Sequence, residues 1–462
     1  MHLRKKNMSF KFLRALAMGK AGSAAISIVA KNRGTNWAGE KAMAIDPEFI
    51  SHLKGIDLEK VLFITGTNGK STVNNLINHI LRNRGFKVVS NVEGANLITG
   101  VATALIKGSS VSGDVDADFY IFETDERYLY QISEQLPCAN LLITNLQKDQ
   151  VQRNGDPDFI YRKISRVIDR FKMRLFLNGD EPRSCSMADK SGSVVFYGVE
   201  KHAKAFTKDD TFVTMPCPKC RSRIRIDYFN NDGMGGFECE RCGFTNANGK
   251  GDSDYMIHDV DFESKKFTLN GVDFTMPYDL PYMMYNYAAA VAVCKELAGV
   301  SEEESSAALE SFKLIGGRID SIEYRGQTIK YMRFKQENPE TLQNFINMIA
   351  QDPEEKVVVI GFGTINDFDP HYINSFYAFD CDYTGLIESN VKKYIFVTDT
   401  IAYDAANSFI YGGVDPAKVE ILPTSDEKEI LNAITSSGCN NVYLTIELHR
   451  FEHMKEFARK EK

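Results

Sequence analysis

The stretch Gly66-Thr67-Asn68-Gly69-Lys70-Ser71, with Thr72 after it, has the composition of a phosphate-binding loop. Glycines let backbone N–H groups approach phosphates, Lys70 can reach the outer phosphates of a nucleotide, and Ser71 can ligate Mg²⁺. The stretch lacks the first glycine of the usual GxxxxGK[ST] pattern, so it is a shortened form. We expect these seven residues to bind ATP; the structural alternative is a Gly-rich turn that only caps a helix.

Three carboxylates, Glu123, Asp125 and Glu126, close an apolar stretch that begins at Phe119. Ligands of open α/β sheets bind at the carboxyl ends of the strands, so we expect these side chains beside Lys70 and in a catalytic role. Glu123 and Ser71 are the expected Mg²⁺ ligands, because Mg²⁺ prefers oxygen. The alternative is an acidic helix start, which is common whatever the function.

Four of the nine cysteines form two CxxC pairs, Cys217 with Cys220 and Cys239 with Cys242. This spacing is typical of a zinc ribbon, and four thiolates leave a tetrahedral Zn²⁺ no open position. We therefore expect a structural Zn²⁺ that folds this segment. Nucleic-acid binding by the ribbon is the alternative, but its basic residues have no aromatic residues interleaved for stacking. The remaining cysteines are expected to be buried: Cys138, Cys185, Cys294, Cys381 and Cys439.

An α/β pattern surrounds these residues. Residues 61–64 predict a strand, and Val73, Leu76, Ile77, Ile80 and Leu81 recur at the spacing of one buried helical face, with Gly85 placed to end that helix. Further strands are expected at 86–90, 119–123 and 141–145. Strands that alternate with helices in this way indicate a parallel sheet.

The pattern stops between about residues 216 and 251, resumes with a helix at 286–297, and reaches a boundary near Gly316-Gly317. Strands expected at 357–360, 394–398, 419–422 and 442–445 predict a second α/β domain. We therefore expect a basic N-terminal helical arm (1–55), a central ATP-binding domain (56–318) that contains the four-cysteine insertion (214–251), and a C-terminal α/β domain (319–462).

The net charge of -7 argues against nucleic-acid binding by the whole chain. The arm is an exception, because the first 34 residues contain Lys and Arg but no acidic residue. No apolar run reaches the roughly 20 residues that span a bilayer. We expect a cytoplasmic protein whose arm docks on the central domain; the alternative is an arm that lies on the inner, anionic face of the membrane.

The segment from Phe63 to Thr72 resembles the nucleotide loop of the Mur ligases, ATP-dependent enzymes that build the peptidoglycan peptide. Within that family the chain is most similar to the MurT type, the ligase-like subunits of lipid II isoglutaminyl synthase, over nearly its whole length. The other matching stretches are Arg33-Gly34-Thr35, Glu93-Gly94-Ala95-Asn96, Asp125-Glu126, Thr144-Asn145 with Asp149-Gln150, Leu177-Asn178, the four-cysteine insertion, Tyr285-Asn286, Gly317-Arg318 and Asn338-Pro339.

This resemblance implies a Mur-ligase-type central P-loop ATPase domain with a zinc-ribbon insertion, followed by a Rossmann-like C-terminal α/β domain. It also implies ATP-dependent amidation of the D-glutamate α-carboxylate of lipid II, through an acyl phosphate, with ammonia from a GatD-like glutaminase partner. Asn286 and Arg318 would contact the nucleotide; the alternatives are a helix-surface Asn and a loop Arg. Only about 55 residues precede the central domain, so a nucleotide-sugar-binding domain is not expected.

Asn374 departs from the MurT pattern, because it stands where an aspartate normally completes the catalytic triad of the partner glutaminase. Asn cannot carry the negative charge that stabilises an imidazolium, although Asp369 or Asp380 lies near enough in sequence to substitute. Two other functions stay open. One is a stand-alone Mur-type ligase that adds an amino acid to a peptidoglycan-like or polyglutamate acceptor; the other is a zinc-ribbon binding protein with a regulatory nucleotide loop.

Overall fold

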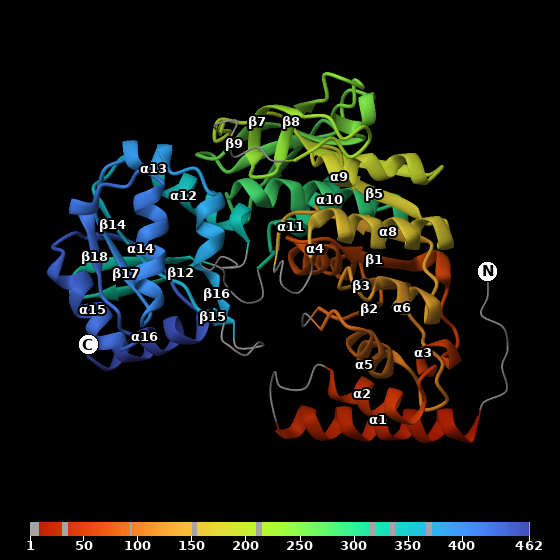
Figure 1. Cartoon of the computed structure of the whole chain (residues 1–462). Helices are drawn as coiled ribbons and strands as arrows, with labels where there is room; N and C mark the ends of the chain where they lie inside the picture. The colour runs from red at the N-terminus through yellow and green to blue at the C-terminus, as the bar shows by residue number, and fades with distance from the viewer. Residues whose placement is uncertain are drawn as a thin grey trace. The chain divides into compact units, whose positions relative to one another are not determined.

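The computed structural model describes residues 9–29, 36–92, 95–149, 155–208, 215–313, 319–332, 338–365 and 372–461. The chain forms two compact units (Figure 1). The first contains residues 1–147, 154–207 and 215–314, and the second contains residues 315–462 with the short stretches 148–153 and 208–214. The division falls beside the predicted boundary at Gly316-Gly317, which itself lies outside the described residues.

The first unit is built on a nine-stranded sheet in the order β11-β10-β9-β6-β5-β4-β1-β3-β2. Strands β1 to β6 and β9 are parallel to their neighbours in this order. Strands β10 and β11 continue the sheet beyond β9 with antiparallel pairing. The strands of this sheet are β1 Val61–Thr65, β2 Val88–Ser90, β3 Phe119–Glu123, β4 Asn140–Ile143, β5 Arg174–Asn178, β6 Val194–Val199, β9 Tyr255–Asp261, β10 Lys266–Leu269 and β11 Val272–Thr275.

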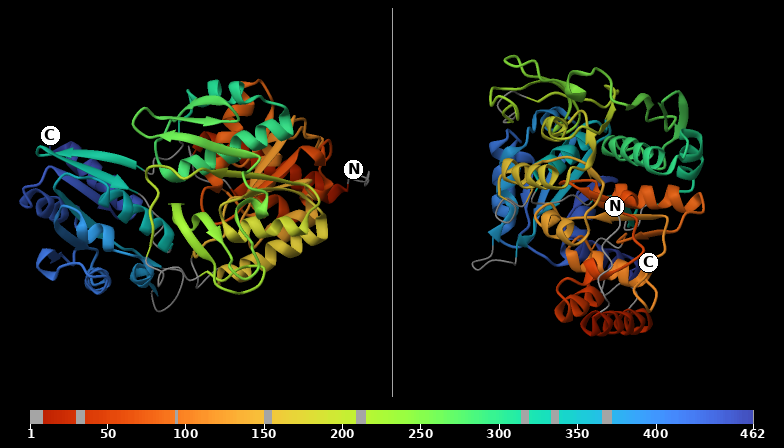
Figure 2. Two further views of the ribbon diagram at one scale, coloured as in Figure 1. Left: turned by 90° about the horizontal axis from the view of Figure 1, so that it is seen from above. Right: turned by 90° about the vertical axis from the view of Figure 1, so that its right-hand side faces the viewer.

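Helices cover both faces of this sheet (Figure 2), and the alternation of strand β1 explains why. Leu62 and Ile64 belong to the core that includes α4 and α10, whereas Val61 and Phe63 belong to the core on the other face. Because successive side chains of a strand point to opposite faces, an all-apolar strand is buried on both sides. The helices of this unit are α1 Phe10–Val29, α2 Trp37–Ile45, α3 Phe49–His52, α4 Lys70–Asn83, α5 Ile98–Gly108, α6 Leu129–Gln135, α8 Pro157–Phe171, α9 Pro182–Ser186, α10 Pro281–Ala298 and α11 Glu302–Leu309.

The basic arm contains helix α1, which packs on the first unit through one face. Phe12, Ala15 and Leu16 are buried, and the Phe12 ring stacks on Phe49 with centroids 5.4 Å apart. The arm therefore docks on the central domain, as the sequence led us to expect. Within the described part of the chain, no helix combines the length and apolar character that crossing a bilayer requires.

The second unit has a six-stranded sheet in the order β12-β13-β19-β14-β17-β18, in which only β12 and β13 pair in antiparallel fashion. Its predicted strands are present, and the antiparallel hairpin is an addition that the sequence did not indicate. The elements of this unit are β12 Ile319–Tyr324, β13 Gln327–Met332, α12 Pro339–Ala350, β14 Lys356–Gly361, β15 Thr364–Ile365, β16 Tyr372–Ile373, α13 Thr384–Glu388, β17 Val391–Val397, α14 Ile401–Tyr411, β18 Val419–Ile421, α15 Glu427–Ser436, β19 Asn441–Thr445 and α16 Leu448–Lys460.

The four-cysteine insertion forms a separate two-stranded antiparallel sheet, β7 Arg225–Asn231 and β8 Met234–Glu238. Its cysteines lie at the end of this hairpin away from the tight turn at Asp232-Gly233, since Cys220 precedes β7 and Cys239 follows β8. The insertion belongs to the first unit.

Candidate functional site

The predicted phosphate-binding loop connects the end of β1 with the first residue of α4, so backbone N–H groups at the helix start face the loop. Gly66 and Gly69 adopt φ angles of 123° and 87°, which favour glycine. A Cβ on Gly66 would lie 2.4 Å from Thr144 Oγ1 and 2.8 Å from the Asn145 carbonyl oxygen. The loop thus packs tightly on the end of β4, in a shape that leaves no room for a side chain at Gly66.

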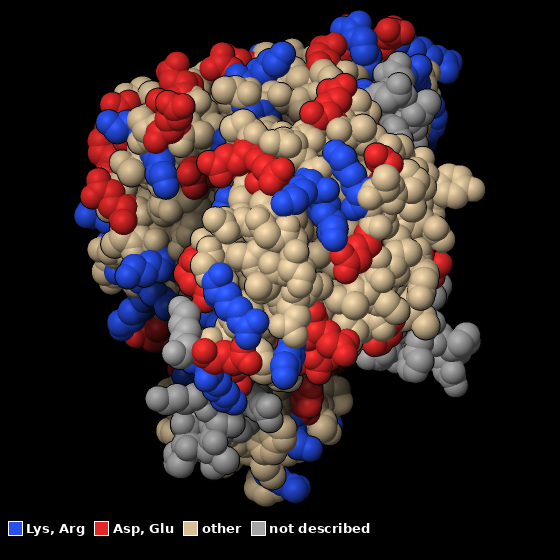
Figure 3. All heavy atoms as spheres, turned by 90° about the vertical axis from the view of Figure 1, so that its left-hand side faces the viewer, with Lys and Arg blue, Asp and Glu red and all other residues tan. Residues whose placement is uncertain are grey.

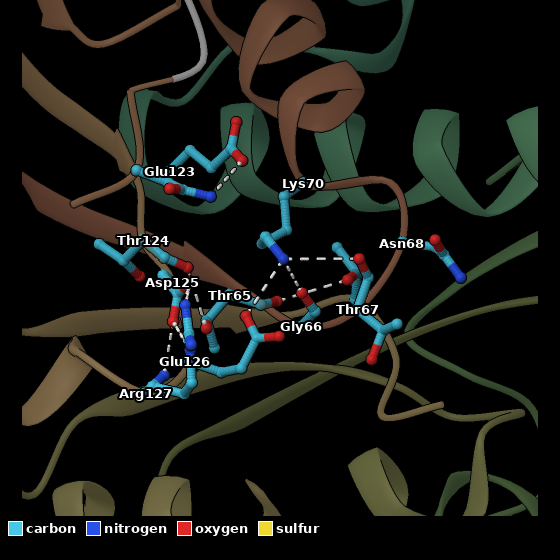
Figure 4. Close-up of polar contacts among 12 residues, drawn as sticks. Thr65, Gly66, Thr67, Asn68, Lys70, Glu123, Thr124, Asp125, Glu126 and Arg127 are labelled. Carbon is cyan, nitrogen blue, oxygen red and sulfur yellow. Dashed lines mark hydrogen bonds and ion pairs between the residues drawn. The ribbon is translucent and has the colours of Figure 1, made fainter. Parts of the chain in front are cut away.

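Lys70 is buried at the centre of this arrangement (Figure 4). Its Nζ donates to the carbonyl of Gly66, and lies 3.1 Å from Glu126 Oε2. Glu126 is 7% exposed, so this ion pair is shielded from solvent. A cation held against the loop backbone is placed to contact phosphate oxygens that the loop would bind.

Glu123 ends strand β3 and points toward Ser71, whose hydroxyl donates to Glu123 Oε2 at 2.6 Å. The other carboxylate oxygen accepts a hydrogen bond from Asn96 at 3.3 Å. A hydroxyl and a carboxylate side by side at the start of α4 match the oxygen ligands that Mg²⁺ takes alongside nucleotide phosphates. These two residues therefore fit a Mg²⁺ site.

Asp125 is oriented differently from its two neighbours. Both of its oxygens accept hydrogen bonds from Arg127, at 3.0 Å from Nε and 2.8 Å from the terminal nitrogen. Burial would raise the pKa of Asp125, but hydrogen bonds from Arg127 and its charge outweigh burial and hold that pKa below its ordinary value. The three predicted carboxylates are close in sequence, yet Glu123 contacts Ser71, Glu126 contacts Lys70 and Asp125 contacts Arg127.

Asn286 lies on α10 and is 6% exposed, with its side chain against the loop. Its Oδ1 would be 2.6 Å from a Cβ at Gly69. Two elements that are far apart in sequence thus meet at the second loop glycine. Arg318 lies outside the described residues, as does Asp369. Asn374 begins a short 3-10 helix, Asn374–Asp380, but its side chain is outside the described part; Asp380 pairs with Lys148 within the second unit.

Two asparagines that we did not predict as functional residues support the site. Asn91 is buried and donates to the carbonyls of Glu123 and Ala95 at 2.8 and 2.7 Å, and it accepts from Glu123 N at 2.9 Å. Asn145 accepts from Asn68 N through its side chain at 3.0 Å. Asn145 was part of a stretch that resembles the Mur ligases, whereas Asn91 carried no such signal.

The four predicted zinc ligands come together. Their sulfur atoms all lie within 4.8 Å of one another, with Cys217 and Cys242 at 3.7 Å and Cys220 and Cys239 at 3.5 Å. Four thiolates around one Zn²⁺ at about 2.3 Å lie about 3.8 Å apart, so the donor set fits a tetrahedral zinc. The other five cysteines are buried, as expected. Burial raises the pKa values of the Cys138, Cys185 and Cys294 thiols.

Comparison with known families gives two matches along the chain. Residues 64–219 match the Mur ligase middle domain, and residues 336–447 match the MurT ligase C-terminal family. The first match contains the phosphate-binding loop, the three carboxylates and Cys217. The second lies within the second unit.

Similar proteins agree with these matches. The chain is 27% identical over 389 residues to the lipid II isoglutaminyl synthase (glutamine-hydrolyzing) subunit MurT of Staphylococcus aureus strain COL, covering 84% of this chain and 85% of that one. It is 23% identical to the subunit of the same name from Streptococcus pneumoniae, covering 97% of both. A pseudomurein peptide ligase type C from Methanothermus fervidus shares the fold with a TM-score of 0.66 and 19% identity, covering 92% of this chain and 84% of that one.

Proposed function

The chain belongs to the Mur ligase family of ATP-dependent ligases, and from this premise we propose that it amidates the D-glutamate α-carboxylate of the lipid II stem peptide to D-isoglutamine. The observation that carries the proposal is that one chain combines a MurT-type C-terminal domain with a phosphate-binding loop. Beside this loop, Lys70 forms an ion pair with Glu126 and Ser71 donates a hydrogen bond to Glu123. The first feature supports the amidation, and the second supports ATP as its energy source.

The proposed reaction uses a small set of residues. Bound Mg²⁺-ATP would supply the γ-phosphoryl group, which turns the carboxylate into an acyl phosphate and so provides a good leaving group. Ser71 and Glu123 would hold the Mg²⁺. Lys70 and the N–H groups at the start of α4 would neutralise the charge on the phosphoryl group as it moves. Ammonia then attacks the acyl carbon, phosphate leaves with the surplus proton, and the amide remains.

A GatD-like glutaminase is the proposed source of ammonia, which would make this chain the synthetase subunit of a heterodimer. The support is the glutamine-hydrolyzing activity in the names of the similar MurT subunits. Nucleic acid is not among the proposed partners. On the face of the molecule in Figure 3, the described Lys and Arg side chains are interspersed with Asp and Glu, whereas a nucleic-acid site needs clustered basic residues.

We also propose a cytoplasmic protein that lies against the inner face of the membrane, where a lipid-linked acceptor is found. The outer face of α1 supports this location, because Phe10, Leu13 and Met18 are 77%, 39% and 47% exposed beside the basic Lys11 and Arg14. Apolar side chains flanked by basic ones suit an anionic lipid surface. Binding to anionic but not neutral vesicles, reduced by Phe10→Ser with Leu13→Ser, is the expected result; equal binding to both vesicle types would contradict it.

The stand-alone amino acid ligase is the second candidate, and one observation favours it. By the resemblance to MurT-type chains, Asn374 stands where such a chain would supply an aspartate to a glutaminase, and an amide cannot take over that charge. Isolation of the chain from its native cells distinguishes the two. A co-purifying glutaminase supports the amidating subunit, and a chain that turns over alone with a free amino acid supports the second candidate.

Purified chain tests the proposed reaction directly. We expect ATP, Mg²⁺, ammonium and a lipid II analogue to give an amidated product with the wild-type chain and none with Lys70→Ala. The product is identified by mass spectrometry. Product that forms only when a free amino acid is added would contradict the proposal.

A further inference from the structure

The four-cysteine insertion reaches the phosphate-binding loop through one buried side chain, Gln147. Its Nε2 donates to the carbonyl of Asp232 in the turn of the β7–β8 hairpin at 2.6 Å. Its Oε1 accepts from Asn68 Nδ2 in the loop at 2.8 Å, and its backbone N donates to Thr67 Oγ1 at 3.0 Å. Gln147 is 7% exposed, so these bonds form away from solvent.

The turn of the hairpin approaches Gln147 closely because of a glycine. Gly233 has a φ of 76°, and a Cβ there would lie 2.6 Å from Gln147 Nε2. Any side chain at this position would therefore displace the amide that joins the insertion to the loop.

The hairpin is also fixed to the main sheet of the first unit, at the end of β5. Gly235 N donates to the carbonyl of Asp180 at 3.0 Å, and Asn246 donates to both Asp180 Oδ1 and the Gly235 carbonyl at 2.8 Å. Asn246 in turn accepts from Phe237 N at 2.9 Å. Cys239 directly follows β8, and Cys220 lies in the segment that leads into β7, so a metal at the four cysteines would hold the open end of the hairpin while the turn contacts Gln147.

We propose that Gln147 is a positioning residue through which the zinc-binding insertion holds Thr67 and Asn68 in the conformation that binds ATP. The insertion then has a role in nucleotide affinity besides its own folding. The inference rests on the proposed ATP site. Loss of the hydrogen bonds of the Gln147 amide leaves the catalytic side chains in place but lets the loop adopt other conformations. The affinity for ATP therefore falls more than the rate of turnover.

Gln147→Met tests the hydrogen bonds, because Met has a similar length and volume but cannot reproduce either bond of the amide. Gln135→Met is the matched control, since Gln135 donates to the carbonyl of Pro47 on an exposed surface. We expect the Kd of a fluorescent ATP analogue to rise about fivefold in Gln147→Met, as the loss of one net hydrogen bond implies, and to stay unchanged in the control. The KM for ATP should rise in parallel while kcat changes little.

Removal of zinc from the whole protein with a chelator provides the second measurement. We expect nucleotide binding by the wild-type chain to weaken. Binding by Gln147→Met should change little, because this variant already lacks the hydrogen bonds that join the insertion to the loop. Should the stripped protein aggregate, Gly233→Ala replaces chelation, since its Cβ displaces the same amide. Equal losses in both backgrounds would overturn the coupling, and so would a Gln147→Met chain that binds ATP as tightly as wild type. A wild-type chain that binds no ATP would instead contradict the proposed function.

Discussion

Alanine at three loop glycines should affect the first unit to three different degrees, because the three share a positive φ but differ in what surrounds them. Gly85, Gly69 and Gly66 have φ angles of 84°, 87° and 123°. A Cβ at Gly85 meets nothing within 4 Å, whereas one at Gly69 meets the side-chain oxygen of Asn286 at 2.6 Å and one at Gly66 meets the backbone oxygen of Asn145 at 2.8 Å. The surroundings therefore become less able to move in that order.

The expected losses follow from these contacts. Gly85→Ala adds only the cost of a left-handed conformation, about 1 kcal/mol of the free energy of unfolding. Gly69→Ala also displaces the end of the Asn286 side chain, so the total loss of unfolding free energy should be about 2 kcal/mol. Gly66→Ala forces the backbone to move and should cost about 4 kcal/mol. ATP binding should be lost in the last two variants and kept in Gly85→Ala, since Gly85 lies beyond the far end of α4.

Urea unfolding followed by tryptophan fluorescence is suited to this series, because Trp37 is the single tryptophan of the chain and belongs to the first unit. The midpoint should fall in the order Gly85→Ala, Gly69→Ala, Gly66→Ala. Equal midpoints for Gly66→Ala and Gly85→Ala would refute the claim that the loop is packed against the end of β4.

Three further results are expected. Asn91→Ala leaves three buried backbone groups without their partner and should cost about 3 kcal/mol of unfolding free energy, measured by the same urea assay; a loss within error would show that Asn91 does not hold Glu123. Ser71→Ala should raise the Mg²⁺ concentration needed for half-maximal ATPase activity about tenfold, and an unchanged Mg²⁺ dependence would exclude Ser71 as a ligand. Burial raises the pKa of Asp180 to about 6, so its contribution to stability is present below about pH 4 and declines by about 3 kcal/mol as the pH rises to 6. Asp180→Asn should remove that decline from stability curves recorded between pH 4 and 6, whereas a slope that persists in the variant would assign it to another group.

The sequence was most informative where local pattern determines structure. The apolar stretch before Gly66 and the helical spacing after it identified β1 and α4, and the cysteine spacing identified a four-cysteine cluster that could hold a metal ion. Glu123 was placed correctly beside Ser71, because the end of a parallel strand determines where its last side chain can lie.

Long-range contacts could not be read from local pattern. Gln147 joins residues 79 and 85 positions away, and Asn91 bonds a residue 32 positions away. Polar side chains of this kind acquire their roles only when the sheet brings distant strand ends together. Asp125 shows the same limit at short range, because its position near the loop was foreseeable but its pairing with Arg127 depends on the exact path of the turn after β3.

The amidation assay with free ammonium is the sharpest test of the proposed reaction, because it does not depend on a partner subunit. We expect the wild-type chain to convert a lipid II analogue to its D-isoglutamine form with one ADP released per amide, and we expect Lys70→Ala to make neither product. Release of ADP without an amide, or a product that incorporates an added amino acid in place of ammonia, would contradict it.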